Sequence, residues 1–278
     1  MPIITYWNPT RDQTGQTMSA IATATKLAID QNVKVLLISP SLNDNTMKDS
    51  FWNEKKGILS GIFGAKANLI NQSGIEGLDR IVRSNKISPE IIKDYTRVKL
   101  KNRLEILLGV TGTEEQYNAI SKQYLEIIVL ASQYYDFVFV DLDKRLSHVL
   151  QKEILKRSDL IIPIISQKES VFQEYEKYFA QIPEINRNKI IYTIGRYNDK
   201  TKYNSKNISR NILRTKDEIN TIPFNNLLFE SSQEGNVVDL LINLSGLKGK
   251  DENTEFMEQI SRLIKDMRYR ISINQSQK

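Results

Sequence analysis

The chain has 278 residues, of which 40% are hydrophobic and 26% charged, a composition typical of a soluble globular protein with a sizeable core. It contains no cysteine, which excludes disulfides, thiol catalysis and cysteine metal sites and fits a reducing cytoplasm. The one histidine, His148, is too few for a histidine metal cluster. The net charge of +6 permits contact with nucleic acid or an anionic membrane without requiring either.

The start of the chain predicts a strand, a loop and a helix in succession. Residues 3–7 form a short apolar run that indicates a buried strand, and residues 17–31 carry apolar side chains at helical spacing. The polar loop between them closes at Gly15. This order is typical of a phosphate-binding loop, where backbone N–H groups and a helix N-terminus hold an anion. A polar loop of no special function, as in any α/β protein, is the alternative.

The loop departs from the common phosphate-binding pattern G-x-x-x-x-G-K-[ST]. Gly15-Gln16-Thr17 stands where G-K-[ST] is expected, so the neutral Gln16 replaces the lysine. Phosphoryl transfer depends on cations beside the phosphate oxygens, and we therefore predict weak or absent ATP hydrolysis. The candidate nucleotide-binding residues of this stretch are Arg11, Asp12, Gln13, Thr14, Gly15, Gln16, Thr17 and Met18.

The rest of the chain alternates predicted strands with predicted helices. Further strands are expected at residues 33–38, 104–108, 136–143, 158–165, 189–194 and 219–223. Helices are expected at residues 74–82, 89–99, 113–135, 169–181 and 234–244. Continuously apolar strands between helices predict an α/β fold. We expect one domain over residues 1–245: a doubly wound, mostly parallel sheet of about seven strands with helices on both faces.

One predicted strand ends in carboxylates. Residues 136–143 are an apolar run closed by Asp141 and Asp143, which is the form of a Walker B strand. Asp141 would then stand near a magnesium ion. The alternative is that Asp141 caps the following helix.

The order and spacing of these segments resemble the ParA/MinD-type P-loop ATPases from residue 2 to about 245, and the altered loop most resembles their CpaE/TadZ branch. In that family the loop reads K-G-G-x-G-K-[ST], so Arg11 stands at the signature lysine and Thr17 at the magnesium-binding hydroxyl. The resemblance implies ATP or ADP with Mg²⁺ held by Thr17 and Asp141, with an empty site as the alternative. It also implies a face-to-face homodimer in which Arg11 reaches the partner's phosphates.

The resemblance locates two further positions. Ser39 and Ser41 stand where relatives carry an acidic D-x-D, and Asp44 could replace those acids only from a displaced loop. Asn198 lies three residues after the place of the family's adenine-reading asparagine, and it is a candidate nucleotide contact.

Residues 196–216 concentrate positive charge and interleave it with tyrosines. Partition ATPases of the family bind DNA through such basic surfaces, and the contact would depend on salt. A solvated face is the alternative. The candidate nucleic-acid or partner surface consists of Arg196, Lys200, Lys202, Lys206, Arg210 and Arg214.

The C-terminal region reads as a linker at residues 246–253, an amphipathic helix at 254–272 and a disordered tail at 273–278. Basic residues flank the apolar stripe of this helix, which resembles the membrane-binding helix of MinD-like proteins. The alternatives are a helix docked on its own core or paired with a partner. The stripe includes Phe256, Ile260, Leu263, Ile264 and Met267.

The predicted function is that of a cytoplasmic positioning or scaffold protein with little or no ATP hydrolysis. It would localise a membrane-associated secretion, conjugation or pilus machine, with peripheral attachment to the inner face of the cytoplasmic membrane as a further expectation. The main alternative is a DNA-binding plasmid or chromosome partition ATPase, with nucleic acid the less favoured partner. A third is an interaction module with an empty site.

Overall fold

The structure is a computed structural model that describes residues 1–10, 12–53, 74–83, 88–211 and 219–276. The strands found there are β1 (Ile3–Trp7), β2 (Val35–Ile38), β3 (Arg97–Leu100), β4 (Leu104–Leu107), β5 (Phe137–Asp141), β6 (Leu160–Ile165), β7 (Thr193–Tyr197) and β8 (Asn220–Pro223). They form one sheet in the order β3-β4-β2-β5-β1-β6-β7-β8. Only the pair β3–β4 is antiparallel among these eight strands. The doubly wound, mostly parallel sheet is thus confirmed, with eight strands in place of about seven.

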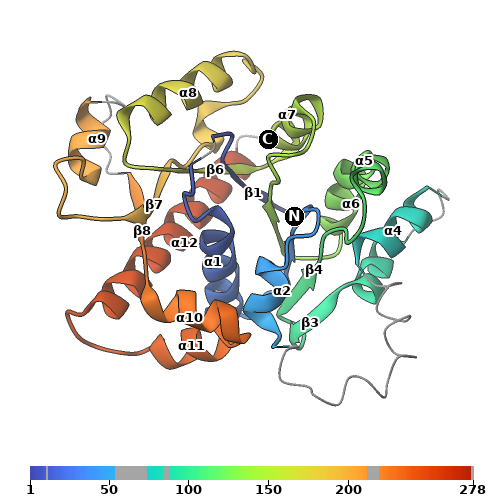
Figure 1. Cartoon of the computed structure of the whole chain (residues 1–278), viewed down its shortest axis with the longest axis horizontal. Helices are drawn as coiled ribbons and strands as arrows, with labels where there is room; N and C mark the ends of the chain where they lie inside the picture. The colour runs from blue at the N-terminus through green and yellow to red at the C-terminus, as the bar shows by residue number, and fades with distance from the viewer. Residues whose placement is uncertain (11, 54–73, 84–87, 212–218, 277–278) are drawn as a thin grey trace.

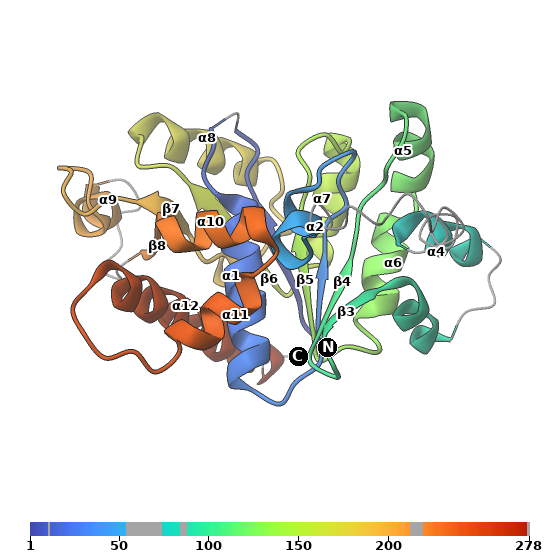
Figure 2. The ribbon, with the colours of Figure 1, turned by 60° about the horizontal axis from the view of Figure 1, so that its bottom comes forward.

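Helices cover both faces of this sheet (Figures 1 and 2). One face carries α1 (Gln16–Asp30), α2 (Thr46–Phe51), α10 (Asn226–Glu234), α11 (Val237–Leu244) and α12 (Glu252–Ser276). The other carries α4 (Ile75–Val82), α5 (Glu114–Ser121), α6 (Tyr124–Ala131), α7 (His148–Arg157), α8 (Glu169–Ala180) and the 3₁₀ helix η3 (Pro89–Tyr95). The remaining short helices are η4 (Arg187–Lys189) and α9 (Ser205–Asn211).

The side chains of β1 show how the two faces are separated. Ile4 and Tyr6 pack into the cluster around α1, while Ile3 and Trp7 pack into the cluster on the opposite face. Successive strand residues point to opposite faces, and here both faces are buried, so the strand is mostly apolar, and its one hydroxyl-bearing aliphatic residue, Thr5, is hydrogen-bonded to Ser158. Trp7 contacts the rings of Tyr175 and Phe179 on α8 at centroid distances of 5.2 and 5.3 Å.

Helix α1 is enclosed by the sheet and by other helices. Every residue from Ser19 to Ala28 is buried. The small side chains of this helix, many of them alanines, allow α11 and α12 to pack against it together with β1, β2 and β5. A helix held this firmly fixes the position of its own N-terminus, which follows the loop after β1.

The C-terminal helix belongs to the same core. Phe256, Ile260 and Leu263 are each 0% exposed, and Ile264 and Met267 are also buried, against α1 and β8 among other elements. The interpretation of these five side chains as a membrane or partner surface is therefore wrong for this fold. The apolar stripe packs against the apolar surface of the domain, as expected for the alternative of a helix docked on its own core.

Several predicted elements differ from the structure. Helix α12 continues to Ser276, so residues 273–276 of the tail predicted to be disordered are helical, and the helix predicted at 234–244 begins only at Val237, after α10 ends at Glu234. Residues 89–99 form η3 and then β3, because residues 97–100 pair with β4 at the edge of the sheet. Residues 113–135 form two helices, α5 and α6, separated at Lys122 and Gln123. Tyr117 on α5 and Tyr124 on α6 both face the core, where their ring centroids lie 6.0 Å apart.

Candidate functional site

The loop after β1 is organised by the side chain of Asn8. Its amide donates to the carbonyl oxygen of Asp12 at 2.9 Å and to Thr14 Oγ1 at 3.1 Å. Its side-chain oxygen accepts from the backbone N–H and hydroxyl of Thr10 and from the Tyr175 hydroxyl. Tyr175 lies on α8, so the buried Asn8 ties the loop to the opposite face of the sheet.

A charged contact holds the middle of the loop. The Asp12 carboxylate accepts from Lys168 Nζ at 2.8 Å and from Ser166 Oγ at 2.9 Å. These hydrogen bonds, that from Lys168 first, hold the pKa of Asp12 below its usual value. Both partners follow β6, so the loop is attached to the neighbouring strand end as well.

Gly15 ends the loop in the left-handed region, with φ 77°, and is the N-cap of α1. It has no side chain with which to cap the helix, so the first N–H groups of α1 keep their capacity to bind an anion. Strand β7 approaches the loop closely: a Cβ built on Gly195 would lie 2.1 Å from the carbonyl oxygen of Thr14.

The first turn of α1 contacts the end of β5. Gln16 Nε2 donates to Asp141 Oδ1 at 2.6 Å and to the carbonyl oxygen of Leu142 at 3.1 Å, so both N–H bonds of this amide are used. Thr17 Oγ1 donates to Asp141 Oδ2 at 2.7 Å. Both carboxylate oxygens of Asp141 therefore accept hydrogen bonds from α1.

The environment of Asp141 disfavours its charge. Burial raises the pKa of this carboxyl to about 6, while the hydrogen bonds from Thr17 and Gln16 act in the opposite direction. The negative charges of Asp44 and Asp143 raise the pKa of Asp141 further. A cation placed among these oxygens would reverse the effect.

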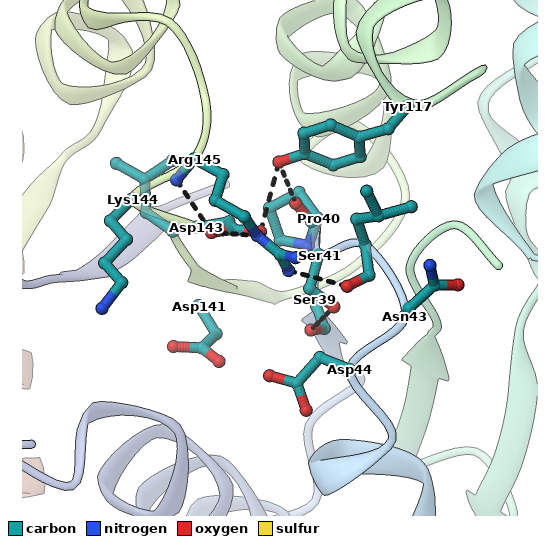
Figure 3. Close-up of polar contacts among 12 residues, drawn as sticks. Ser39, Pro40, Ser41, Asn43, Asp44, Tyr117, Asp141, Asp143, Lys144 and Arg145 are labelled. Carbon is teal, nitrogen blue, oxygen red and sulfur yellow. Dashed lines mark hydrogen bonds and ion pairs between the residues drawn. The ribbon is translucent and has the colours of Figure 1, made fainter. Parts of the chain in front are cut away.

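These groups line a polar cleft of about 440 Å³ at the carboxyl ends of β1, β2 and β5. Asp44, Thr17 and Asp141 line it together. Ser39 and Ser41, at the acidic positions of the resemblance, are hydrogen-bonded to each other at 2.9 Å (Figure 3). Asp44 thus reaches the cleft from the loop after β2. The oxygens of Thr17, Asp141 and Asp44 are of the type that Mg²⁺ prefers, so the residues present fit this ion.

A second, mainly apolar pocket of about 280 Å³ adjoins the same loop and shares Gln13, Gly15 and Met18 with the cleft. Its wall includes Phe224 and Arg196, whose guanidinium carbon lies 5.2 Å from the Phe224 ring centroid. Arg196 has φ 50° at a register shift in the β7–β8 pairing, and such bulges redirect a side chain.

The structure brings most of the predicted nucleotide contacts together. Residues 12–18 and Asp141 all line the cleft. Arg11 lies outside the described residues. Asn198 lines neither cavity: its backbone N–H donates to Gln167 and its side-chain oxygen accepts from the Lys200 N–H. The structure therefore does not place Asn198, the expected adenine contact, at the site.

The predicted basic surface is divided. Lys200, Lys202, Lys206 and Arg210 are exposed on α9 and the turn before it. Arg196 lies instead beside the loop and the Phe224 ring. Arg214 falls outside the described residues.

Sequence reasoning missed two features of the site. The role of Lys144 in lining the cleft was not predicted, although it lies three residues after Asp141. Arg196 was assigned to a nucleic-acid surface, and the aromatic Phe224 beside it carried no signal in its own segment. Lys144 was hidden because it lies in a loop, whose course the sequence pattern does not fix, and Arg196 because an irregularity in the β7–β8 pairing directs its side chain.

The site thus lies where a strand, a loop and a helix follow one another at the carboxyl edge of a mostly parallel sheet, with a strand-end carboxylate hydrogen-bonded to the helix. Comparisons with protein-family models and with curated proteins give no match. A comparison with solved structures matches nearly the whole chain. The similar structures include a ParA family ATPase from Chlorobium tepidum TLS, with TM-score 0.70 and 13% identity over 95% of this chain and 98% of that chain.

Two further structures are similar in the same way. A putative plasmid partition protein from Borrelia burgdorferi B31, bound to AMPPNP, has TM-score 0.60 and 19% identity, over 94% of this chain and 97% of that one. The septum site-determining protein MinD from Pyrococcus horikoshii OT3, complexed with Mg-ADP, has TM-score 0.64 and 14% identity, over 94% and 95%. The chain has the fold of these ParA/MinD-type P-loop ATPases.

No described helix is both long and apolar enough to span a bilayer. Within the described ranges, acidic residues and the histidine form no cluster of three or more that could hold a metal ion. The pair Asp44 and Asp141 remains compatible with Mg²⁺, which commonly takes one or two carboxylates and completes its shell with phosphate and water.

Proposed function

We propose that the cleft binds ATP or ADP with Mg²⁺ and hydrolyses ATP weakly or not at all. The shape of the site supports this ligand class. A polar cleft at a helix N-terminus and an apolar pocket meet at Gln13 and Gly15, which suits a phosphate chain on one side of the loop and a base on the other. AMPPNP and Mg-ADP in two similar structures add support.

In this proposal Thr17, Asp141 and Asp44 hold the magnesium ion. When bound, Mg²⁺ would neutralise phosphate charge. Thr17 donates a hydrogen bond to Asp141, and the negative charge of Asp44 raises the pKa of Asp141, so the site is arranged for a cation. The backbone N–H groups at the start of α1 would contact phosphate oxygens directly.

The observation that carries the prediction of poor hydrolysis is the state of Gln16. Its amide stands at the lysine position, is neutral, and has both N–H bonds engaged by Asp141 and Leu142. The described part of the loop, residues 8–10 and 12–15, contains no lysine or arginine. Among the described residues, the α1 side of the cleft therefore offers no cation to stabilise charge developing on the phosphate.

We further propose that the protein acts as a ParA/MinD-like positioning scaffold of the CpaE/TadZ type. As a cytoplasmic homodimer, it would place a membrane-associated secretion, conjugation or pilus machine. A nucleotide-binding fold with a neutral residue at the catalytic lysine favours a stable docking platform over a cycling switch. The second candidate is a DNA-binding partition ATPase, favoured by the four exposed basic residues at and before α9.

Isothermal titration of the full chain with ADP or ATP and Mg²⁺, followed by phosphate-release measurement, tests the proposal. We expect binding that Thr17→Ala and Asp141→Ala weaken, with phosphate release near background. The absence of nucleotide binding by the wild-type chain would overturn it. Family-typical turnover that Thr17→Ala abolishes would overturn the hydrolysis claim alone.

DNA binding across a salt series separates the two candidates. A partition ATPase would bind DNA with an affinity that falls steeply with salt and drops in a Lys200→Ala/Lys202→Ala/Lys206→Ala variant. If the protein is a positioning scaffold, we expect the triple variant to show no loss of DNA affinity relative to the wild type.

A further inference from the structure

The cleft contains four carboxylates and a single basic side chain among its described lining residues. The carboxylates belong to Asp12, Asp44, Asp141 and Asp143, and the base is Lys144. A polyphosphate could not enter such a cleft unless most of the negative charge were already balanced.

Two of the four carboxylates are balanced within the chain. Asp12 pairs with Lys168 at 2.8 Å, and Asp143 pairs with the Arg145 guanidinium at 2.9 Å. Asp44 and Asp141 remain for a magnesium ion. Lys144 is then the one basic side chain among the described lining residues of the cleft, and no carboxylate there requires it as a partner.

The backbone around Lys144 is fixed on both sides. Asp143 accepts from the backbone N–H of Arg145 at 2.9 Å and from the Tyr117 hydroxyl at 3.2 Å. Gln151 Nε2 donates to the carbonyl oxygens of Lys144 and Leu146, at 3.2 and 2.7 Å. The loop after β5 is thus anchored to α5 and to α7.

The side chain of Lys144, in contrast, is free. It is exposed, and no described residue pairs with its amine. Figure 3 shows it extending on the side of the strand end where Asp141 lies, away from the network of Asp143, Arg145 and Tyr117. A rigid base with an unpaired long cation is suited to reach an anion in the cleft.

We propose that Lys144 supplies the phosphate-binding cation that Gln16 does not, by binding a β- or γ-phosphate oxygen of a nucleoside di- or triphosphate. This rests on the proposed nucleotide site. The cation comes from the loop after β5, on the Asp141 side of the cleft, and not from α1. The protein thereby keeps a cation that binds the phosphate chain, although this cation comes from a different position than the lysine of the phosphate-binding loop.

The test is isothermal titration of the full chain with ADP and with AMP, each with Mg²⁺. For Lys144→Met we expect ADP affinity to fall by about tenfold or more, as for loss of a charged hydrogen bond, and AMP affinity to change little. Lys144→Arg should retain ADP affinity within a few-fold. Lys152→Met, which removes the same charge from α7 outside the cleft, is the matched control and should bind as wild type.

The possible failures are distinct. If the wild-type chain binds ADP and Lys144→Met binds it equally, the role of Lys144 is overturned and the nucleotide site stands. If Lys152→Met loses as much affinity as Lys144→Met, the effect is one of general charge and the assignment is again overturned. If the wild type binds no nucleotide, both proposals fall. Because the side chain is exposed, thermal unfolding of the unliganded variant should match wild type.

Discussion

The amide of Gln16 donates a 2.6 Å hydrogen bond to Oδ1 of Asp141, joining the first turn of α1 to the end of β5. In a loop with lysine at this place, a positive charge would face the phosphates and the carboxylate would be free for metal. Here the neutral amide is turned toward the carboxylate. The hydrogen bonds from Gln16 and Thr17 to Asp141 consequently hold the first turn of α1 to the end of β5.

Replacing Asp141 by asparagine should stabilise the unliganded protein at neutral pH. The folded pKa of about 6 lies above the unfolded value near 3.8, so the carboxyl favours the fold below pH 4, and this contribution is lost as pH rises through 6. Asparagine does not ionise in this range, so the Asp141→Asn protein does not lose this stability as the pH rises. We expect a gain of about 2 kcal/mol in the free energy of unfolding at pH 7.5 and none at pH 3.5, measured by urea denaturation.

Asp143→Asn is the matched control for this experiment. It removes the charge that pairs with Arg145 at 2.9 Å, which lowers stability, and also a negative charge that raises the pKa of Asp141, which acts in the opposite direction, so it should not reproduce the gain from Asp141→Asn at pH 7.5. An Asp141→Asn effect that is the same at both pH values would contradict the assigned cause.

Gln16→Lys should increase ATP hydrolysis. The new amine would stand at the lysine position of the phosphate-binding pattern, beside Asp141 and the proposed magnesium ion. One well-placed cation or donor commonly changes the rate by about 10²-fold, and the altered loop leaves us expecting about tenfold or more. Phosphate release under saturating ATP measures it, with Gln16→Met as the neutral control. Equal rates in the two variants would show that the missing lysine is not what limits turnover.

Gly195→Ala should destabilise the loop. The new Cβ would lie 2.1 Å from the Thr14 carbonyl oxygen, and neither atom can rotate away, because the Cβ is fixed by the backbone of residue 195 and the oxygen is itself a backbone atom. We expect a loss of about 1–3 kcal/mol in unfolding free energy together with weaker ADP binding. In Gly249→Ala the nearest atom would lie at 3.5 Å, so this control should behave as wild type. Normal stability of Gly195→Ala would mean that β7 and the loop are not in such contact.

Truncating a buried side chain of α12 should lower the free energy of unfolding of the domain. It should leave sedimentation with anionic vesicles unchanged. Phe256 is 0% exposed, and Phe256→Ala should cost about 3–5 kcal/mol. Tyr269, 64% exposed on the same helix, is the control, and Tyr269→Ala should change stability little. Urea denaturation gives the first result, and sedimentation with anionic vesicles gives the second. Vesicle binding that Phe256→Ala abolishes while the fold survives would restore the membrane-helix interpretation.

The sequence predicted the sheet because its central strands are buried on both faces. β1, β5 and β6 are almost entirely apolar and were assigned closely from that property. The edge strand β3 was taken for part of a helix, because its residues pair with β4 through contacts that no local pattern reveals. Tertiary pairing overrode local propensity there.

The candidate site was predictable where it follows a strand end and not where it depends on a loop. Thr17 and Asp141 were placed by the strand–loop–helix order and the strand-end carboxylate, and they meet at 2.7 Å. Asp44 and Lys144 reach the cleft through the course of loops after β2 and β5, which depends on packing. The stripe of α12 was visible, but amphipathicity cannot say whether its apolar side faces lipid, a partner or the same chain.

Trp7 ends β1 against the aromatic rings of α8, one residue before Asn8 organises the loop. The chain has two tryptophans, and the other, Trp52, lies beneath the Arg97 guanidinium at 4.0 Å. A Trp52→Phe protein would therefore emit from a single buried indole, one residue before the loop that lines the cleft. Its fluorescence provides a built-in optical reporter of what the loop holds, with no dye attached.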